Sequence, residues 1–396
     1  MCVVEYDGAV SAWSVGLFTE CYRPIQNGIV ASVDALAQTL CAHGHDVTIV
    51  APRMPRFDDA AAGVVRIPSL PLPTRTAYRL TVPYLPRIPR PLSIVHAHSP
   101  FVTGALAVAY ARRCNLPLVF TYHTQLEAYA HYIPFESNVT RAAAKLLTRS
   151  YANAADAVVV PTRAMEEQLR AIGVERPIAV VPSGIDVATF ARGRRSDALR
   201  ARLGIESHER IILAVGRLGR EKNVELALQA FARVTAPDVR LVVVGDGTHR
   251  RALERTAQRL GIAARTTFAR EFARETLPDA YASADVFLFT SRSETQGLVL
   301  IEALAAGASV VAVDTPQTRE VLAGAGTVAA DNAEALAIAL DRSLANGSNA
   351  DEAARARAWD YDARDCASGI MALYATLIER PSLHARRART GRPQPV

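Results

Sequence analysis

The stretch from Val286 to Gly307 constrains the fold more than any other part of the chain. Its first residues, 286–289, form an apolar run rich in Val and Phe, which is typical of a strand buried in a sheet. A polar segment that ends at Gly297 interrupts this run, and residues 298–306 have the apolar spacing of a helix. A strand, a loop and a helix in this order indicate an open α/β sheet, in which ligands bind outside the carboxyl ends of the strands.

Two glutamates lie in this segment. Glu294 is in the loop, and Glu302 is about one turn into the predicted helix, eight positions later. Both are therefore expected to face the same crevice. The first backbone N–H groups of the helix favour an anion there, because Gly297 has no side chain to block its approach. An anionic group flanked by carboxylates that bind hydroxyl groups suggests a sugar phosphate.

A second motif follows another predicted strand, Ile211–Val215. The sequence continues Gly216-Arg-Leu-Gly-Arg-Glu-Lys222 and then enters a helix of apolar spacing. Fixed cations beside a helix start stabilise the negative charge that builds on a departing phosphate, without a metal ion. A further strand, residues 241–244, runs into a glycine turn at Gly245 and is expected to line the same cleft.

The amino-terminal half begins with a β-loop-α-β unit. Val15–Thr19 predicts a strand, residues 30–40 a helix, and Val47–Ala51 the next strand. The loop between them contains Gly28 but lacks Gly-x-Gly-x-x-Gly, so a nicotinamide site is not expected. A plain tight turn remains an alternative explanation of this loop.

Two basic segments follow. Residues 66–91 contain five arginines and seven prolines without one acid, and they predict a mobile amphipathic loop rather than a regular helix or a central strand. Arg141, Lys145 and Arg149 share one face of a predicted helix, opposite an apolar face. Such helices can lie on anionic lipid, although a merely solvated helix has the same pattern.

Two further predicted strands end at histidines. The pair His96 and His98 has the spacing of zinc ligands, but no third ligand is spaced to join it, so no metal site is expected. The second strand runs into Tyr122-His123-Thr124.

Length and composition limit the class of protein. The 396 residues suit two domains of roughly 180 to 200 residues each. The chain has no uncharged apolar run of the ~18 residues that a transmembrane helix needs, and its first twenty residues do not resemble a signal peptide. Five scattered cysteines are expected to be reduced thiols. A net charge of +6 permits an acidic partner.

Four ordered motifs, namely the Gly28 loop, the Tyr-His-Thr stretch, the Arg217–Lys222 segment and the Glu294–Glu302 pair, resemble the retaining glycosyltransferases of family 4, group 1. The resemblance implies the GT-B fold, an α/β architecture of two Rossmann-like, doubly wound parallel-sheet domains that face a central cleft. It places an acceptor-binding domain at 1–185, a nucleotide-sugar-binding domain at 186–362, a helix crossing back at 363–380, and a basic disordered tail at 381–396.

The resemblance also implies the roles of single residues. The diphosphate would be bound by Arg217 and Lys222, and the ribose hydroxyls by Glu302. The donor sugar would be positioned by Glu294, His123 and the Gly297-Leu298 backbone. The residues expected to bind the donor are Gly28, Gly216, Arg217, Lys222, Gly245, Glu294, Gly297, Leu298 and Glu302. The expected catalytic residues are His123, Arg217, Lys222 and Glu294, and the expected acceptor residues are Tyr129, His131 and Tyr132.

The family is thought to use a same-face displacement in which the leaving phosphate accepts the acceptor proton, with an Asp or Glu general base as the alternative. The motifs Glu-Thr-Gln-Gly and Tyr-His-Thr resemble those of diacylglycerol glucosyltransferases. This implies UDP-glucose as donor, a lipid or saccharide acceptor, an anionic membrane surface as partner, no nucleic acid, no cofactor, and a place at the inner face of the cell membrane. The alternatives are a GDP-mannose-dependent mannosyltransferase, a nucleotide-sugar epimerase and an inactive binding subunit.

Overall fold

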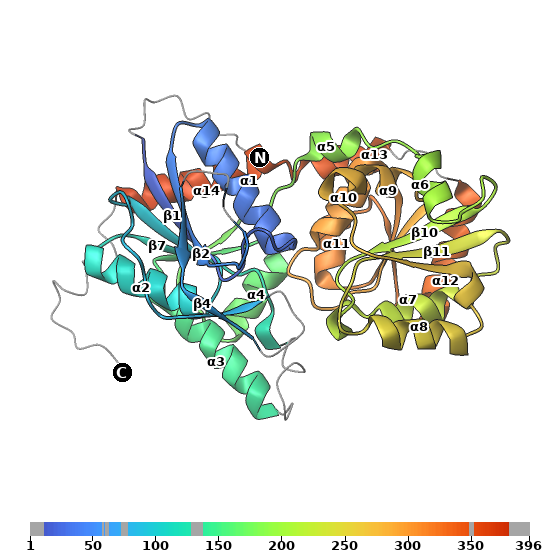
Figure 1. Ribbon diagram of the computed structural model, residues 1–396, viewed down its shortest axis with the longest axis horizontal. Helices are drawn as coiled ribbons and strands as arrows, with labels where there is room; N and C mark the ends of the chain where they lie inside the picture. The colour runs from blue at the N-terminus through green and yellow to red at the C-terminus, as the bar shows by residue number, and fades with distance from the viewer. Residues whose placement is uncertain are drawn as a thin grey trace. The chain divides into compact units, whose positions relative to one another are not determined.

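The computed structural model in Figure 1 describes residues 12–57, 59, 63–72, 78–127, 138–347 and 352–379. The chain divides into two compact units. The first unit comprises Met1–Thr121, Tyr151–Val158 and Ile370–Val396, and the second comprises Tyr122–Ser150 and Val159–Gly369. Two large sheets and the helices beside them form the fold, as the α/β prediction requires.

The first large sheet has seven strands in the order β3-β2-β1-β6-β7-β8-β9. The strands are β1 (Ser14–Phe18), β2 (Asp46–Pro52), β3 (Val64–Ile67), β6 (Ile94–Ala97), β7 (Leu118–Thr121), β8 (Ala157–Val160) and β9 (Ile178–Val180). The helices in this part of the chain are α1 (Gly28–Ala42), α2 (Val102–Cys114), α3 (Asn138–Ala154) and α4 (Arg163–Ala171). The strands from β3 to β7 pair in parallel. The predicted β-loop-α-β unit is confirmed as β1, α1 and β2.

The basic segment at 66–91 has more regular structure than its prolines predict. Strand β3 lies at the edge of the sheet and includes Arg66. Two short strands, β4 (Ser69–Pro71) and β5 (Arg79–Thr81), pair in an antiparallel manner, with Leu70 opposite Leu80. The prediction of a loop throughout is therefore wrong, because proline is tolerated at the end of an edge strand. The described residues of this segment contain neither a regular helix nor a central strand, as predicted. Residues 73–77 lie outside the described residues.

The second large sheet has six strands in the order β12-β11-β10-β13-β14-β15. The strands are β10 (Arg210–Val215), β11 (Val239–Val244), β12 (Thr266–Ala269), β13 (Val286–Phe289), β14 (Ser309–Val313) and β15 (Thr327–Ala329). The α-helices are α5 (Val187–Ala191), α6 (Asp197–Arg202), α7 (Val224–Phe231), α8 (Arg250–Arg259), α9 (Leu277–Ala282), α10 (Leu298–Ala306), α11 (Pro316–Leu322), α12 (Ala333–Asn346) and α13 (Glu352–Trp359). Short 3-10 turns occur at Arg220–Lys222, Ala263–Arg265 and Arg274–Thr276. All the strand pairs of this sheet are parallel.

Both faces of this second sheet are buried, which explains why its strands are continuous apolar runs. Phe287 and Phe289 of β13 join a core with α5, α9, α10 and α13, whereas Val286 and Leu288 join a core with α7, α8 and α12. Figure 1 shows these two sets of helices on opposite faces of the sheet. Helix α10 is apolar nearly all round and lies deep in the first of these cores.

The two segments at which the predicted domains meet lie side by side. Ile185 forms a parallel bridge with Asp362, its N–H donates to the carbonyl of Tyr361 at 3.0 Å, and its carbonyl accepts from Ala363 N at 2.9 Å. A Cβ atom on Gly184 would lie 2.5 Å from the Cα atom of Ala363, so only glycine permits this approach. The boundaries at 185 and 362 stay predictions.

Helix α14 (Ala363–Ile378) forms where the sequence predicts a closing helix. In the first unit, Tyr374 of this helix bonds the Nδ1 atom of His96 at 2.5 Å, and the Nε2 atom of His96 bonds the hydroxyl of Thr121 at 2.6 Å. His96 is thus a buried structural residue that joins β6, β7 and α14. The predicted basic tail, 381–396, lies outside the described residues.

Helix α3 exposes apolar as well as basic side chains. Its buried side chains are Thr148, Tyr151 and Ala152, whereas Val139 and Leu146 are 76% and 62% exposed. The basic residues predicted for one face of this helix, Arg141, Lys145 and Arg149, are exposed as well. The outer surface of α3 is therefore amphipathic.

Candidate functional site

The candidate site lies at the carboxyl ends of β10 and β13, which are neighbours in the second large sheet. The chain proceeds from β10 through β11 and β12 to one edge of the sheet, and from β13 through β14 and β15 to the other. The order of the strands therefore reverses between β10 and β13. In doubly wound sheets this switch point is where ligands bind, because the two following loops diverge there.

The loops that follow β10 and β13 are joined by hydrogen bonds. Thr290 donates its hydroxyl to the carbonyl of Lys222 at 3.2 Å, and the hydroxyls of Ser291 and Ser293 donate to the carbonyl of Glu221 at 3.2 and 3.3 Å. The β10 loop thus takes its position from the β13 loop. Two motifs about 70 residues apart in the sequence form one surface as a result.

Lys222 and Glu294 form an ion pair between the Nζ and Oε1 atoms. Their side chains are 23% and 20% exposed, so the pair is accessible from one side. Burial would raise the pKa of the Glu294 carboxyl, but Lys222, Ser291 and Arg217 together hold this pKa below its ordinary value. Glu294 is therefore a carboxylate at neutral pH.

The side chain of Arg217 is oriented by Glu221, a residue that the sequence motifs do not single out. The Nη2 atom of Arg217 lies 2.8 Å from the Oε1 atom of Glu221, whose side chain is fully buried while that of Arg217 is 37% exposed. A Cβ atom on Gly219 would lie 2.3 Å from the Oε2 atom of Glu221, so the glycine leaves room for this carboxylate in its present position. The charged end of Arg217 is thereby held beside the Lys222 loop.

Gly216 and Gly245 directly follow the neighbouring strands β10 and β11 and have φ angles of +154° and +138°. A Cβ atom on Gly245 would lie only 2.0 Å from the carbonyl oxygen of Gly216. These two glycines, which are predicted to bind the donor nucleotide sugar, are thus in contact with each other. They have no side chains that would obstruct a ligand.

Helix α10 begins beside the ion pair. Gly297 is its N-cap residue, with a φ angle of +89° and no side-chain capping bond, and Leu298 is its first residue. The first N–H groups of a helix have no acceptor within the helix, so they can bind an anion. The predicted strand, loop and helix of the Val286–Gly307 stretch are confirmed here.

Glu302 lies deeper than Glu294. It is 7% exposed, and its Oε2 atom accepts a hydrogen bond of 2.7 Å from the hydroxyl of Tyr281 on α9. Burial raises the pKa of Glu302 above its ordinary value, and Tyr281 opposes that shift. No periodicity in the sequence marks Tyr281 as the partner of Glu302, because the two residues come from different helices.

His123 follows β7 and is contacted through its backbone. Its carbonyl oxygen accepts from the hydroxyl of Thr295 at 3.2 Å. Burial lowers the pKa of the imidazole to about 4, so His123 is neutral at pH 7. The second unit thus brings His123 and the loop with Glu294 together, and their role in binding a donor sugar stays a prediction.

Gly28 belongs to the first unit, whereas the residues described above belong to the second. It is the exposed first residue of α1, and Asn27 caps that helix by accepting from the N–H of Val30 at 2.9 Å. The role of Gly28 stays a prediction. The predicted acceptor residues Tyr129, His131 and Tyr132 lie outside the described residues.

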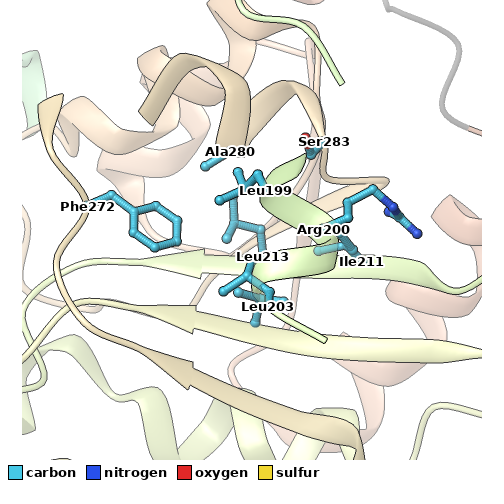
Figure 2. Close-up of a pocket in the computed structure, with 9 residues that line it drawn as sticks. Leu199, Arg200, Leu203, Ile211, Leu213, Phe272, Ala280 and Ser283 are labelled. Carbon is cyan, nitrogen blue, oxygen red and sulfur yellow. The ribbon is translucent and has the colours of Figure 1, made fainter. Parts of the chain in front are cut away.

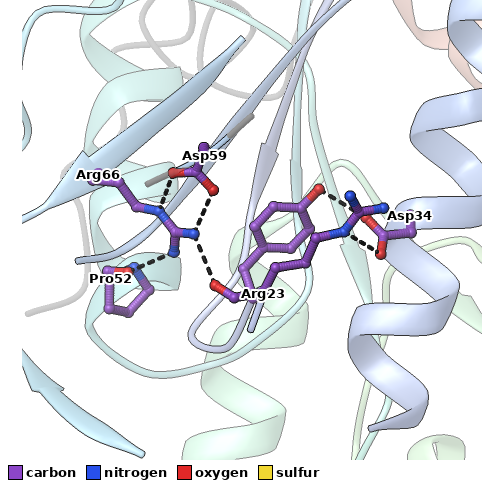
Figure 3. Close-up of polar contacts among 6 residues, drawn as sticks. Arg23, Asp34, Pro52, Asp59 and Arg66 are labelled. Atoms are coloured by element: carbon purple, nitrogen blue, oxygen red, sulfur yellow. Dashed lines mark hydrogen bonds and ion pairs between the residues drawn. The ribbon is translucent and has the colours of Figure 1, made fainter. Parts of the chain in front are cut away.

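The loop that leads to Gly28 is braced by Arg66, as Figure 3 shows. The guanidinium donates to both carboxylate oxygens of Asp59 at 2.7 and 2.6 Å and to the carbonyls of Pro52 and Arg23 at 2.8 Å each. Arg23 in turn pairs with Asp34 of α1 at 2.9 Å. Arg66, expected to belong to a mobile loop, therefore joins β2, β3 and the loop after β1.

An apolar cavity in the second unit lies apart from these residues. Its lining comes mainly from α6, α9, β10 and β11, and Figure 2 shows Leu199, Leu213 and Phe272 around it. With a volume of about 10 Å³ it has room for about one water molecule. Arg200 lines it, but its guanidinium donates to the carbonyls of Glu206 and Glu209. The cavity is a packing void.

Two absences hold for the part of the chain that the structure describes. No group of three or more His, Cys, Asp or Glu side chains is placed to bind a metal ion. No helix there has the length and apolar character needed to span a bilayer.

The fold and the position of the site define a class of protein. A sucrose-phosphate synthase from Thermosynechococcus elongatus superposes with a TM-score of 0.76 over 93% of this chain and 99% of that one, at 22% identity. WaaG, a glycosyltransferase involved in lipopolysaccharide biosynthesis, superposes with a TM-score of 0.64 over 92% and 99%, at 19% identity. The fold is therefore GT-B, with two Rossmann-like domains, as predicted.

Sequence comparison identifies the family. Residues 26–189 match the model of Glycosyltransferase Family 4, and residues 195–362 match that of Glycosyl transferases group 1. An alpha-monoglucosyldiacylglycerol synthase of Streptococcus pneumoniae is 34% identical over 316 residues, which cover 76% of this chain and 71% of that protein. The chain belongs to glycosyltransferase family 4, group 1, and is a retaining hexosyltransferase, which confirms the predicted family and enzyme class.

Two other relatives show the range of the family. An alpha-monoglucosyldiacylglycerol synthase of Acholeplasma laidlawii is 29% identical over 317 residues, which cover 75% of this chain and 79% of the relative. A GDP-mannose-dependent alpha-mannosyltransferase of Mycobacterium tuberculosis is 33% identical over 321 residues, which cover 78% and 81%. A relative named for a glucosyl lipid and one named for GDP-mannose are thus similar to this chain to nearly the same degree.

Proposed function

We propose that this enzyme transfers glucose from UDP-glucose to a lipid acceptor, diacylglycerol, with retention of the anomeric configuration. The observation that carries the proposal is the cluster of Arg217, Lys222 and Glu294 at the switch point between β10 and β13, beside the start of α10. The choice of glucose and diacylglycerol is supported by the names of the relatives from Streptococcus pneumoniae and Acholeplasma laidlawii.

The two cations are suited to a departing diphosphate. Each charge pair at ~4 Å contributes about 4 kcal/mol before desolvation when the effective dielectric constant is about 20. Lys222 already has a counterion in Glu294, and Arg217 has one in Glu221, so both cations are oriented before a ligand arrives. Such preorganised charges stabilise the phosphate oxygens as the glycosidic bond breaks.

The sugar would lie beside the loop of Glu294. A carboxylate at neutral pH accepts hydrogen bonds from sugar hydroxyls, and the N–H groups at the start of α10 donate to phosphate. His123, neutral at pH 7, can hydrogen-bond a hydroxyl without adding charge. The leaving phosphate would accept the acceptor proton on the same face of the sugar.

Membrane contact is the second part of the proposal. Helix α3 exposes Val139, Leu146 and Leu147 together with Lys145 and other basic residues. Apolar side chains insert at the lipid boundary, while each basic group near an anionic surface contributes about 1 kcal/mol. We infer that α3 binds the membrane that supplies the lipid acceptor.

A GDP-mannose donor is the alternative that a specific observation favours. The mannosyltransferase of Mycobacterium tuberculosis is 33% identical to the chain.

The test of the reaction is a matrix of donors and acceptors. UDP-glucose, UDP-galactose and GDP-mannose are each incubated with diacylglycerol, monoglucosyl lipid and soluble sugars, and products are identified by mass and by NMR of the anomeric proton. We expect an α-glucosyl lipid from UDP-glucose and diacylglycerol. If GDP-mannose were the only donor that gave a product, a mannosyl product would support the alternative. Isomerisation of the donor sugar in the absence of an acceptor would indicate an epimerase.

The test of membrane contact is sedimentation with vesicles. The wild type should sediment with vesicles of phosphatidylglycerol and phosphatidylcholine, and less so as salt increases, because exposed charges are screened. Leu146→Asp together with Lys145→Glu should reduce sedimentation by about tenfold. Arg251→Glu together with Gln258→Asp, which lowers the charge by the same amount at exposed positions of α8, is the control. Equal sedimentation of both variants would contradict the role of α3.

A further inference from the structure

The loop that carries Glu294 is bonded to two segments that lie far from it in the sequence. The backbone carbonyl of Glu294 accepts from the Nε2 atom of Gln125 at 3.0 Å. Thr295 donates its hydroxyl to the carbonyl of His123 at 3.2 Å and accepts the hydroxyl of Thr162 on its own carbonyl at 2.9 Å. Residues 123–125 follow β7, and Thr162 follows β8.

The next residue, Gln296, is bonded to a third segment, the one that follows β9. Its Oε1 atom accepts from the N–H of Ser183 at 2.8 Å, and its Nε2 atom donates to the carbonyl of Ser183 at 3.1 Å. Gln296 is 3% exposed. Its side-chain amide thus pairs with one backbone residue through both a donor and an acceptor, in the way that one strand pairs with another.

Only a side chain with both groups at this length can form this pair. A carboxylate accepts but does not donate, an apolar side chain does neither, and Asn is one methylene too short. Because Ser183 offers one donor and one acceptor, the pair also determines which way the amide of Gln296 points. Loss of the amide removes both of these hydrogen bonds to the backbone of Ser183.

We propose that Gln296 is a positioning residue for the donor sugar, an inference that rests on the proposed function. It stands between Glu294, whose carboxylate pairs with Lys222, and Gly297, the cap of α10. The bonds of Thr295 and Gln296 keep this loop from moving relative to His123 and Ser183. Gln296 is not among the proposed side-chain ligands of the nucleotide, which are Arg217, Lys222 and Glu302, so its loss should affect the sugar more than UDP.

The experiment compares three proteins: the wild type, Gln296→Met and Gln258→Met. Methionine has nearly the length of glutamine but lacks the amide, and Gln258 is an exposed residue of α8. For each protein we measure UDP affinity by calorimetry, kcat and KM with UDP-glucose and diacylglycerol, and hydrogen exchange of peptides that cover 180–186 and 291–300. Thermal unfolding is followed in parallel.

For Gln296→Met we expect kcat to fall by about 10- to 100-fold, because a displacement of ~1 Å at a reacting centre has an effect of this size. The affinity for UDP should change by less than about threefold, and exchange should become faster in both peptides. Gln258→Met should match the wild type. A kcat equal to that of the wild type would overturn the inference, and so would parallel losses of UDP affinity, kcat and melting temperature.

Failure of the proposed function is seen separately, as a wild type that transfers no sugar from any donor. In that event hydrogen exchange decides the inference by itself. Unchanged exchange at 291–300 in Gln296→Met would refute a positioning role, whereas faster exchange there with an unchanged melting temperature would support it.

Discussion

The ammonium group of Lys222 and the carboxylate of Glu294 form an ion pair that joins the loops after β10 and β13. The pair is neither at the surface nor fully buried, because both side chains are about one-fifth exposed. The two opposite charges therefore compensate each other, yet both side chains remain partly accessible to solvent.

Replacement of Lys222 by Ala should lower turnover by about 100-fold or more, as expected for loss of one electrostatic stabiliser. The loss should appear mainly in kcat, because the charge on the departing phosphate is greatest in the transition state. Steady-state kinetics with UDP-glucose measures it, and Arg251→Ala at an exposed position of α8 is the control. Near-normal turnover of Lys222→Ala would remove Lys222 from the mechanism.

Acidification should destabilise the protein through His123. The unfolded chain binds a proton there near a pKa of ~6.5, whereas burial lowers the folded pKa to about 4. As the pH falls from 6.5 to 4, the unfolded state takes up more protons, and the free energy of unfolding decreases. Between pH 7 and pH 5 this amounts to about 2 kcal/mol.

Urea unfolding at pH 7 and pH 5 tests this dependence. His123→Gln should lose about 2 kcal/mol less between the two values than the wild type does. His208→Gln, at a side chain that is 64% exposed, is the matched control and should behave as the wild type. An equal pH dependence of His123→Gln and the wild type would contradict the burial of the imidazole.

Substitution of Gly245 by Ala should be far more damaging than the same change at Gly261. Both glycines have a positive φ angle, but the new Cβ atom at 245 would lie 2.0 Å from the carbonyl oxygen of Gly216, while at 261 it would meet nothing within 4 Å. Gly261→Ala should therefore cost about 1 kcal/mol of backbone strain. Gly245→Ala should cost roughly 3 kcal/mol or more, because the ends of β10 and β11 must separate.

Equilibrium urea unfolding of both variants measures the difference. Calorimetric titration with UDP should also show weaker binding for Gly245→Ala alone, since the loop after β10 supplies Arg217. Similar losses of stability in the two variants would mean that the two strand ends can separate without cost.

Replacement of Arg66 by Lys should destabilise the first unit by about 1 to 3 kcal/mol. The guanidinium makes four hydrogen bonds at once, to Asp59, Pro52 and Arg23, and a single ammonium group cannot reproduce their directions. Hydrogen exchange of peptides at 19–27 should become faster. Arg56→Lys, at an exposed position, should leave both stability and exchange unchanged, and an equally silent Arg66→Lys would contradict the bracing role.

The sequence predicts the fold well where the spacing of apolar residues matches the faces that are buried in the structure. Three local signals each indicate a single structure: the apolar run at 286–289, the glycine at 297 and the helical spacing after it. The apolar run indicates a strand, because a strand in the middle of a parallel sheet is buried on both faces. The arginines and prolines of 66–91 did not predict the β4–β5 pair, since pairing depends on a partner strand as well as on propensity.

The sequence by itself determined the order of strands and helices, the glycines at the strand ends and the identity of the charged residues at the site, because each of these depends on neighbours within a few positions. Only the tertiary structure decided that Lys222 pairs with Glu294, that Tyr281 bonds Glu302, and that Gln296 pairs with Ser183. Those contacts join residues from separate loops and helices. Their formation depends on how packed elements bring distant side chains within hydrogen-bonding distance, and spacing along the chain contains no such information.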